Sequence, residues 1–324
     1  MWRSTLFCVA FSGCGFNASV QQGDGPHADA AGPRVDGAID GMVTATTCMT
    51  HWLDGSVAVS APQELSTLST TGSERDPWIS SDGLTLYYAG HPLVGGTSEI
   101  YRASRASTAQ LFGNPAAQLS LNRSDSDESR AALTPDEKML VLASNRGIGA
   151  KYDVYITTRS DTALDFGSPD MRHMVNVDAG NDDDFDPFLT FDGLRLYLAP
   201  APPVGSGRQH ISLATRPDTG SDFSSPVPVP ALMSQSLDGD PALSLDERII
   251  VFSSTRSGGM GGTDLWYATR PSATASFGTP KPIPTVNGSM NDGDPMLSAD
   301  GCELYFSSSR TGGDYDLYVA TITP

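Results

Sequence analysis

Charged side chains are scarce in this chain of 324 residues, at 18%, and positive charge is the scarcer kind. Lysine and arginine number 20 against 38 aspartates and glutamates, which gives a formal net charge of −18. So acidic a chain repels phosphate backbones and anionic lipid headgroups, which excludes nucleic acid and an anionic membrane face as partners. The chain also lacks any segment with the periodicity of an amphipathic helix. Glycine (33) and proline (23) are plentiful, and this composition favours short strands joined by tight turns.

One short phrase recurs five times, at intervals of about 54 residues. Each copy has acidic residues, then a serine or threonine, then an aspartate followed by glycine or glutamate, and then an apolar strand. The hydroxyl and the carboxylate can both cap backbone N–H groups of a turn. A unit of this length cannot bury its own apolar face, so the copies must stack around a shared core. The turn aspartates are Asp82, Asp136, Asp192, Asp246 and Asp300.

Each repeat contains four predicted strands. In the fifth copy, residues 294–298 lead into the turn, residues 303–307 form an apolar strand and residues 316–320 form a third. A Phe-x-x-Pro segment introduces the fourth strand in the other copies. Four antiparallel strands per repeat are typical of a propeller blade, so the predicted fold class is all-β. These Phe-x-x-Pro segments begin at Phe112, Phe166, Phe223 and Phe277.

The phase of the repeats predicts how the ring closes. The fifth copy ends after its third strand, whereas residues 57–68 precede the first copy and carry Pro62 in register with the Phe-x-x-Pro segments. This N-terminal stretch therefore supplies the outer strand of the last blade and leaves no free sheet edge. We predict a single propeller of five four-stranded antiparallel blades over residues 48–324. A sixth blade would have to fit into residues 42–56, which are too few.

The repeated phrases resemble the WD-repeat-like propeller repeats of the TolB type over residues 57–324. The matching features are Ser-x-Asp-Gly before a strand such as Leu304-Tyr305-Phe306, and a later Asp-Leu-Tyr or Asp-Leu-Trp. The resemblance implies a propeller fold. It implies little about activity, because propellers carry many functions.

The first residues have the character of an export signal. Arg3 supplies a positive charge, residues 5–11 are apolar, and Ser12 and Gly13 precede Cys14. This order resembles a bacterial lipoprotein signal, which implies a signal over residues 1–14 and lipidation of Cys14; cleaved secretion and the absence of a signal are the alternatives. The composition of residues 15–47 predicts a disordered acidic linker. We expect an exported monomer in the periplasm, on the outer membrane or at the cell surface, touching the membrane only through its lipid.

Two cysteines remain in the predicted propeller, Cys48 and Cys302. Cys48 lies shortly before the closing strand of the last blade, and Cys302 follows the turn aspartate of the same blade. The repeat phase places both on one rim of that blade. Since an exported protein folds in an oxidising compartment, we predict a disulfide between them, with two separate thiols as the alternative.

Acidic residues recur eight and six positions before the turn aspartates, and Arg130 replaces the second acid in one repeat. We expect both acids to point to one side of an extended segment, at the mouth of the central channel, together with Arg146, Arg256 and Arg310. Two interpretations are open. These residues either form inter-blade salt bridges or bind a cation or a cationic ligand; calcium is the metal that suits carboxylate oxygens. The candidate binding residues are Asp184, Asp186, Asp238, Asp240, Asp292 and Asp294.

Three functions follow from these features. The leading hypothesis is a non-enzymatic scaffold that binds another envelope protein or a glycan on one face, with no catalytic residues and no obligatory cofactor. The second is a carbohydrate-active enzyme that uses channel-mouth carboxylates as acid and base or nucleophile. The third is a lyase or lactonase with calcium in the channel. The repetition of the acids in every blade favours structural use over a single catalytic pair.

Overall fold

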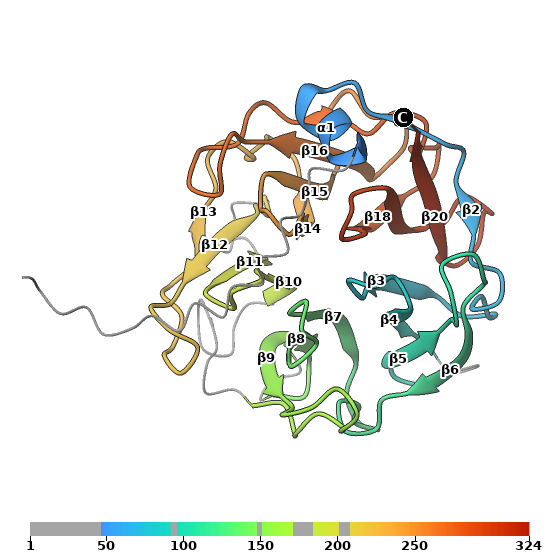
Figure 1. Ribbon diagram of the computed structural model, residues 1–324, viewed down its shortest axis with the longest axis vertical. Coiled ribbons are helices and arrows are strands. Elements are labelled where there is room, and N and C mark those ends of the chain that lie inside the picture. The colour runs from blue at the N-terminus through green and yellow to red at the C-terminus, as the bar shows by residue number, and fades with distance from the viewer. Residues whose placement is uncertain (1–46, 92–95, 148–150, 171–183, 201–207, 324) are drawn as a thin grey trace, which may run out of the picture. The chain divides into compact units, whose positions relative to one another are not determined.

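The computed structural model describes residues 47–91, 96–147, 151–170, 184–200 and 208–323. Five small antiparallel sheets are arranged in a ring around a central channel (Figure 1). The predicted signal, Cys14 and all but the last residue of the predicted linker lie outside the described residues. The all-β, five-bladed prediction is confirmed.

Within each blade the strands follow one another outward from the channel in chain order. The first blade contains β3 (Glu74–Ile79), β4 (Thr85–Gly90), β5 (Glu99–Ser104) and β6 (Gly113–Ala117). The second contains β7 (Glu128–Leu133), β8 (Met139–Ser144) and β9 (Asp153–Thr158). The third contains β10 (Asp184–Leu189), β11 (Arg195–Pro200), β12 (Ser212–Thr215) and β13 (Val227–Pro228). The fourth contains β14 (Asp238–Leu243), β15 (Ile249–Ser254), β16 (Asp264–Thr269) and β17 (Lys281–Pro282). The fifth contains β18 (Asp292–Leu297), β19 (Glu303–Ser308) and β20 (Asp316–Thr323).

The N-terminal segment completes the fifth blade. Two short strands, β1 (Ala58–Val59) and β2 (Gln63–Glu64), pair antiparallel with β20 on either side of Pro62. The innermost strands contact one another around the ring, and β18 contacts β3. The predicted ring closure is therefore confirmed, and it joins the two ends of the propeller by main-chain hydrogen bonds.

The predicted outer strand of the second blade lies partly outside the described residues. Among the described residues of that blade the sheet has three strands, and only an isolated bridge between Ile156 and Asp170 stands where a fourth was expected. Phe166 is nevertheless buried, as are the equivalent phenylalanines of the other blades. The Phe-x-x-Pro segment thus marks a packing position, while the pairing that follows it varies in length from blade to blade.

The turn chemistry holds in each repeat. In the first blade, Ser80 Oγ donates to Asp82 Oδ1 at 2.6 Å, and that carboxylate accepts the N–H of Leu84 at 2.9 Å. Gly83 follows with a φ of 70°. Equivalent hydroxyl–carboxylate pairs close the turns at Asp136, Asp192, Asp246 and Asp300. These aspartates therefore build turns.

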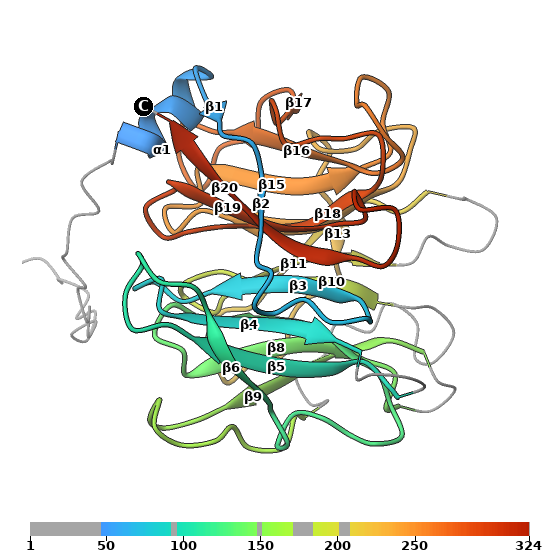
Figure 2. The same ribbon diagram turned by 90° about the vertical axis from the view of Figure 1, so that its right-hand side faces the viewer.

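A short helix that the sequence pattern did not predict, α1 (Thr47–Asp54), precedes the closing strands. Its buried Trp52 donates from Nε1 to the carbonyl oxygen of Gly301 at 3.0 Å, in the turn between β18 and β19. Gly301 has a φ of 69°, and Met49 lies where a side chain on this residue would stand, so glycine leaves room for the packing of α1 here. Figure 2 shows α1 on the same side of the ring as the turn between β3 and β4.

Candidate functional site: the mouth of the central channel

In the four repeats where the structure describes its side chain, the first acid is buried. Asp238 is fully buried, and its Oδ1 accepts hydrogen bonds from Ser254 Oγ and Arg256 Nη2, both at 2.6 Å. Arg256 also donates to the carbonyl oxygen of Leu232 at 2.7 Å and lies over the ring of Trp266. The serine, arginine and acid thus tie the loop between the second and third strands to the segment that enters the blade.

The same arrangement recurs in two other blades. In the fifth, Asp292 accepts from Ser308 and Arg310, each at 2.6 Å. In the second, Glu128 accepts from Ser144 and Arg146, each at 2.9 Å. These arginine–carboxylate salt bridges join residues of one blade. A contact between blades at this position is that of His210 Nδ1, 3.5 Å from Asp238 Oδ2.

The first blade departs from this pattern. Glu74 is 1% exposed, but no described cationic side chain forms a salt bridge with it. Its carboxylate accepts only from the backbone N–H and hydroxyl of Thr70, at 3.1 and 2.5 Å. Gly90 stands where the second, fourth and fifth blades have the serine. Burial raises the pKa of Glu74, and the hydrogen bonds from Thr70 offset part of that rise.

The second acid of each repeat lies at a β-bulge and belongs to a ring around the channel. The bulge shifts the register between the innermost strand and its neighbour in every blade. Its residue takes a left-handed conformation, with φ between 51° and 59°. This turn of the backbone separates the two acids in the first, fourth and fifth blades, so the expectation that they share one side is wrong there. The ring consists of Asp76, Arg130, Asp186, Asp240 and Asp294.

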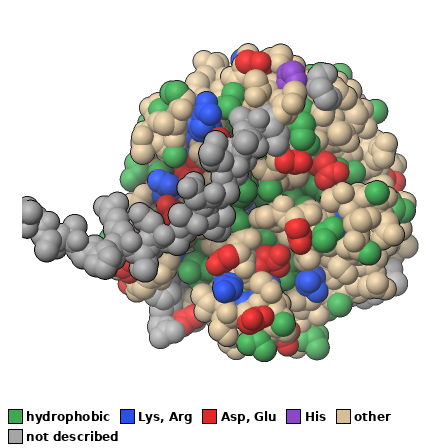
Figure 3. Space-filling model, in the orientation of Figure 1, with side chains coloured by type: hydrophobic (Ala, Val, Ile, Leu, Met, Phe, Trp, Pro, Cys, Tyr) green, Lys and Arg blue, Asp and Glu red, His purple; other side chains and the backbone are tan. Residues whose placement is uncertain are grey.

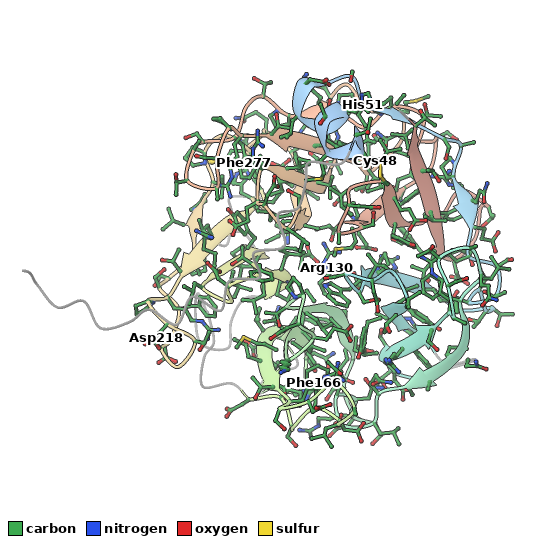
Figure 4. All side chains as sticks on the ribbon, in the orientation of Figure 1. Cys48, His51, Arg130, Phe166, Asp218 and Phe277 are labelled. Carbon is green, nitrogen blue, oxygen red and sulfur yellow. A yellow bond between two sulfur atoms is a disulfide. The ribbon has the colours of Figure 1, made fainter. Side chains whose placement is uncertain are left out.

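Arg130 holds the ring together from near its centre (Figure 4). Its Nη1 lies 3.5 Å from Asp76 Oδ1, 3.7 Å from Asp240 Oδ1 and 3.3 Å from Asp294 Oδ1. One guanidinium nitrogen therefore contacts carboxylates from three blades. The inter-blade salt bridges expected from the sequence are therefore present. They are formed by the second position of each pair and by Arg130, and not by the arginines of the loops between the second and third strands.

Backbone hydrogen bonds add to this stitching. The N–H of Arg130 donates to Asp76 Oδ2 at 3.1 Å, the N–H of Asp240 to Asp186 Oδ2 at 3.2 Å, and the N–H of Asp294 to Asp240 Oδ2 at 3.3 Å. Each bond joins equivalent positions of neighbouring blades. The aspartate ring is thus part of the fold as well as the floor of the channel mouth.

The ring carries more negative than positive charge. Four carboxyl groups face one guanidinium, and burial together with the charges of their neighbours raises the pKa of Asp186 and Asp294 well above the ordinary value. Burial opposes ionisation of Asp240 too, but Arg130 and the hydroxyl of Ser253 outweigh it and lower that pKa. The Nη2 of Arg130 has no hydrogen-bond partner among the described residues. The hydrogen-bonding capacity of Arg130 is therefore not fully used within the described part of the ring.

A cavity of about 370 Å³ opens above the ring. Its wall includes residues that precede the third strand of four blades, namely Tyr152, Gln209, Thr263 and Tyr315. Arg75 is exposed at the rim and lies 3.4 Å above the ring of Tyr315. A polar and aromatic wall over a carboxylate floor can hold one side chain or one sugar unit. We call this cavity, with its ring and wall, the mouth.

Apolar side chains fill the channel beneath the ring. Trp78, Phe188 and Met296 line a cavity of about 10 Å³ there, which is no larger than one water molecule requires. Ala132 and Ala242 complete this layer. The mouth is therefore a cup closed at its base. Figure 3 views the other face of the ring, which carries α1, and its visible acidic and basic side chains are scattered among apolar ones.

The structure divides the predicted binding residues into two groups. Asp186, Asp240 and Asp294 line the mouth, whereas Asp238 and Asp292 are buried in their blades. Asp184 begins β10, and its side chain lies outside the described part. In the described residues no group of three or more His, Cys, Asp or Glu side chains has the arrangement of a metal site. The sequence pattern did not indicate Arg75, Tyr152, Gln209 or Tyr315. Tyr152 and Tyr315 each precede the aspartate that begins the third strand of their blade, and this shared position is the signal that could have found them.

The structure contains the disulfide between Cys48 and Cys302, with the Cα atoms 5.2 Å apart. It links α1 to the start of β19, on the opposite side of the ring from the mouth. The bond therefore fastens the N-terminal segment to the blade that it completes and leaves the mouth open.

Solved propellers share this fold. A family-43 glycoside hydrolase matches with a TM-score of 0.54 at 10% identity, over 78% of this chain and 89% of its own. An α-L-arabinofuranosidase of Podospora anserina also matches with a TM-score of 0.54 at 10% identity, over 82% and 95%. A TolB protein of Agrobacterium tumefaciens aligns over 81% and 97% with a TM-score of 0.47 at 14% identity. No protein-family model and no curated protein sequence matches this chain. These similarities concern the fold, and they place the chain among five-bladed β-propellers.

Proposed function

We propose that this protein is a non-enzymatic binding scaffold that takes a group from another protein or a glycan into the mouth. The observation that carries the proposal is the cavity of about 370 Å³ above an incompletely neutralised carboxylate ring. Other acids of the repeats close turns, such as Asp82, or bind a loop of their own blade, such as Asp238 and Asp292. A rigid ring with one polar cup is suited to binding, because little conformational entropy is lost when a ligand enters.

The binding role can be tested by filling the mouth. Thr255 is exposed on its wall, so Thr255→Trp should block the cavity. Thr219→Trp on the β12–β13 loop is the matched control, because it adds the same side chain outside the mouth. Both proteins would be screened against peptide libraries and glycan arrays. Ligands that bind the wild type and the control but not Thr255→Trp support the proposal; binding that survives in Thr255→Trp contradicts it.

A second candidate is a carbohydrate-active enzyme, the alternative that the fold of the family-43 hydrolase brings to mind. Its support is the contrast in the ring, where the pKa of Asp186 and Asp294 is raised and that of Asp240 is lowered. A protonated and an ionised carboxyl side by side are what glycoside hydrolysis requires. Incubation with arabinoxylan and other polysaccharides tests it, since product release that Asp240→Asn abolishes would establish the enzyme and refute the scaffold.

We also propose that the protein is exported and anchored through a lipid on Cys14, with residues 15–46 as a tether. The Cys48–Cys302 disulfide supports export, because such bonds persist in oxidising compartments. No helix among the described residues is both long and apolar enough to cross a bilayer. In a bacterium with lipoprotein processing, the wild type should incorporate labelled palmitate and Cys14→Ala should not. Equal labelling of both would refute the anchor.

A further inference from the structure

An apolar edge lies beside the mouth in the fourth and fifth blades. Leu237 lines the cavity with 47% of its surface exposed, and its N–H and C=O are both bonded to Thr255. Met260 and Met290 are 74% and 41% exposed on the two segments that continue outward from this wall. Large apolar side chains grouped beside a polar cavity offer a partner an apolar contact surface.

These apolar residues belong to neighbouring segments. The carbonyl oxygen of Met290 lies where a side chain on Gly261 would stand, so the two loops touch. The next residue, Asn291, accepts the N–H of Thr263 through Oδ1 at 3.1 Å, and Thr263 lines the mouth. Leu237, Met260 and Met290 are therefore placed to be met by one extended ligand, and we call them the apolar edge.

The charge of the mouth indicates the other half of that ligand. Among the described residues, Asp76, Asp186, Asp240 and Asp294 face the cations Arg130, within the ring, and Arg75, at the rim. Arg130 is 7% exposed, and its Nη2 still lacks an acceptor in the described residues. A cationic group entering from above would satisfy the excess carboxylate charge, and a carbonyl or a water carried with it could take up the remaining N–H.

We propose that the mouth docks a basic, partly apolar protein segment, with a lysine or arginine side chain in the cup and apolar neighbours on the apolar edge. The inference rests on the proposed binding function and names the partner class. A glycan offers no aliphatic side chains to cover exposed methionine and leucine, whereas an extended peptide does. Methionine also adapts to differently shaped apolar partners, which suits recognition of a segment rather than a rigid surface.

The probe is a phage-displayed library of random dodecapeptides selected on the disulfide-bonded protein. Enriched peptides should share one lysine or arginine with an apolar residue close by. In calorimetry with the best synthetic peptide, Nε-acetylation of its lysine, or replacement of its arginine by citrulline, should weaken binding at least tenfold. Binding should also weaken as salt rises, because the contact is between charges.

Three variants of the chain make the readout specific. Gln209→Lys places a fixed cation in the cup and should abolish binding, while the same change at exposed Gln110, on the β5–β6 loop, should leave it unchanged. Arg75→Glu removes the rim cation and should tighten binding. Leu237→Ser should weaken binding several-fold. Unchanged melting temperatures would show that each variant is folded.

The outcomes distinguish failure of the basic-segment inference from failure of the proposed scaffold function. Enriched peptides without a cation, or amino-sugar and neutral glycans that bind while peptides do not, would overturn the basic segment but keep the scaffold, provided that Thr255→Trp blocks them. No ligand that depends on the mouth, together with polysaccharide cleavage that Asp240→Asn abolishes, would overturn both. Binding of basic peptides that is equal in Gln209→Lys and Gln110→Lys would overturn the placement in the cup.

Discussion

Replacing Glu74 or Glu128 by glutamine removes the same charge from equivalent positions of neighbouring blades, yet we expect different effects on stability. Glu128 is fully buried and accepts from Arg146 and Ser144, so Glu128→Gln leaves a buried guanidinium without its counter-ion. Breaking a buried ion pair from one side costs about 3–5 kcal/mol. Glu74 has no such partner in the described part of the chain.

In Glu74→Gln the amide can keep both hydrogen bonds with Thr70, since its oxygen accepts the N–H and its NH₂ can donate to the hydroxyl. The substitution removes a charge that burial disfavours, so the free energy of unfolding should rise or stay unchanged at pH 8. The two variants should then differ by at least about 3 kcal/mol. At about 2 °C per kcal/mol for a domain of this size, their melting temperatures should differ by about 6 °C.

The pH dependence provides a second readout. Because the pKa of Glu74 is raised in the folded protein, its contribution to stability is complete below its ordinary value of 4.5 and is lost as pH rises through the folded value. Wild type and Glu74→Gln should therefore converge in denaturant midpoint as pH falls towards 4.5 and separate towards pH 8. Glu128→Asp is the control, because aspartate serves the same role at Asp238 and Asp292. Equal destabilisation by Glu74→Gln and Glu128→Gln at pH 8 would refute the reasoning.

The remaining predictions concern the ring and the disulfide. Arg130→Met should destabilise by about 3–5 kcal/mol in urea unfolding, because three carboxylates lose their shared cation, and an effect near zero would contradict its central role. Because the pKa of Asp186 and Asp294 is raised, their contribution is lost as pH rises through the folded values, so the melting temperature should be higher near pH 5 than at pH 8; the lowered pKa of Asp240 acts in the opposite sense only at lower pH. Cys48→Ser and Cys302→Ser should each lower stability by up to about 5 kcal/mol, and the double variant no further, whereas additive losses would argue against a shared bond. If calcium binds in the mouth, it should raise the melting temperature of the wild type but not of the double variant Asp186→Asn, Asp294→Asn; an unmoved wild-type curve would exclude calcium.

The sequence by itself determined the architecture, because the order of turns and apolar strands is a local pattern that is present in all five repeats. Ser80 and Asp82 close their turn with groups only a few residues apart, and the phase of Pro62 sufficed to predict that β1 and β2 complete the fifth blade. The sequence pattern did not predict the helix α1, because eight residues are too few to show a helical period.

Only the tertiary structure decided what the acids do. Two acids spaced by one residue look alike in the sequence, but the left-handed bulge at Asp76 or Asp240 turns one into the channel and leaves the other within the blade. The place of Arg130 among three carboxylates depends on closing a ring of residues far apart in the chain. The mouth likewise gathers Tyr152, Gln209 and Tyr315 from three different blades, so their proximity depends on the closed ring.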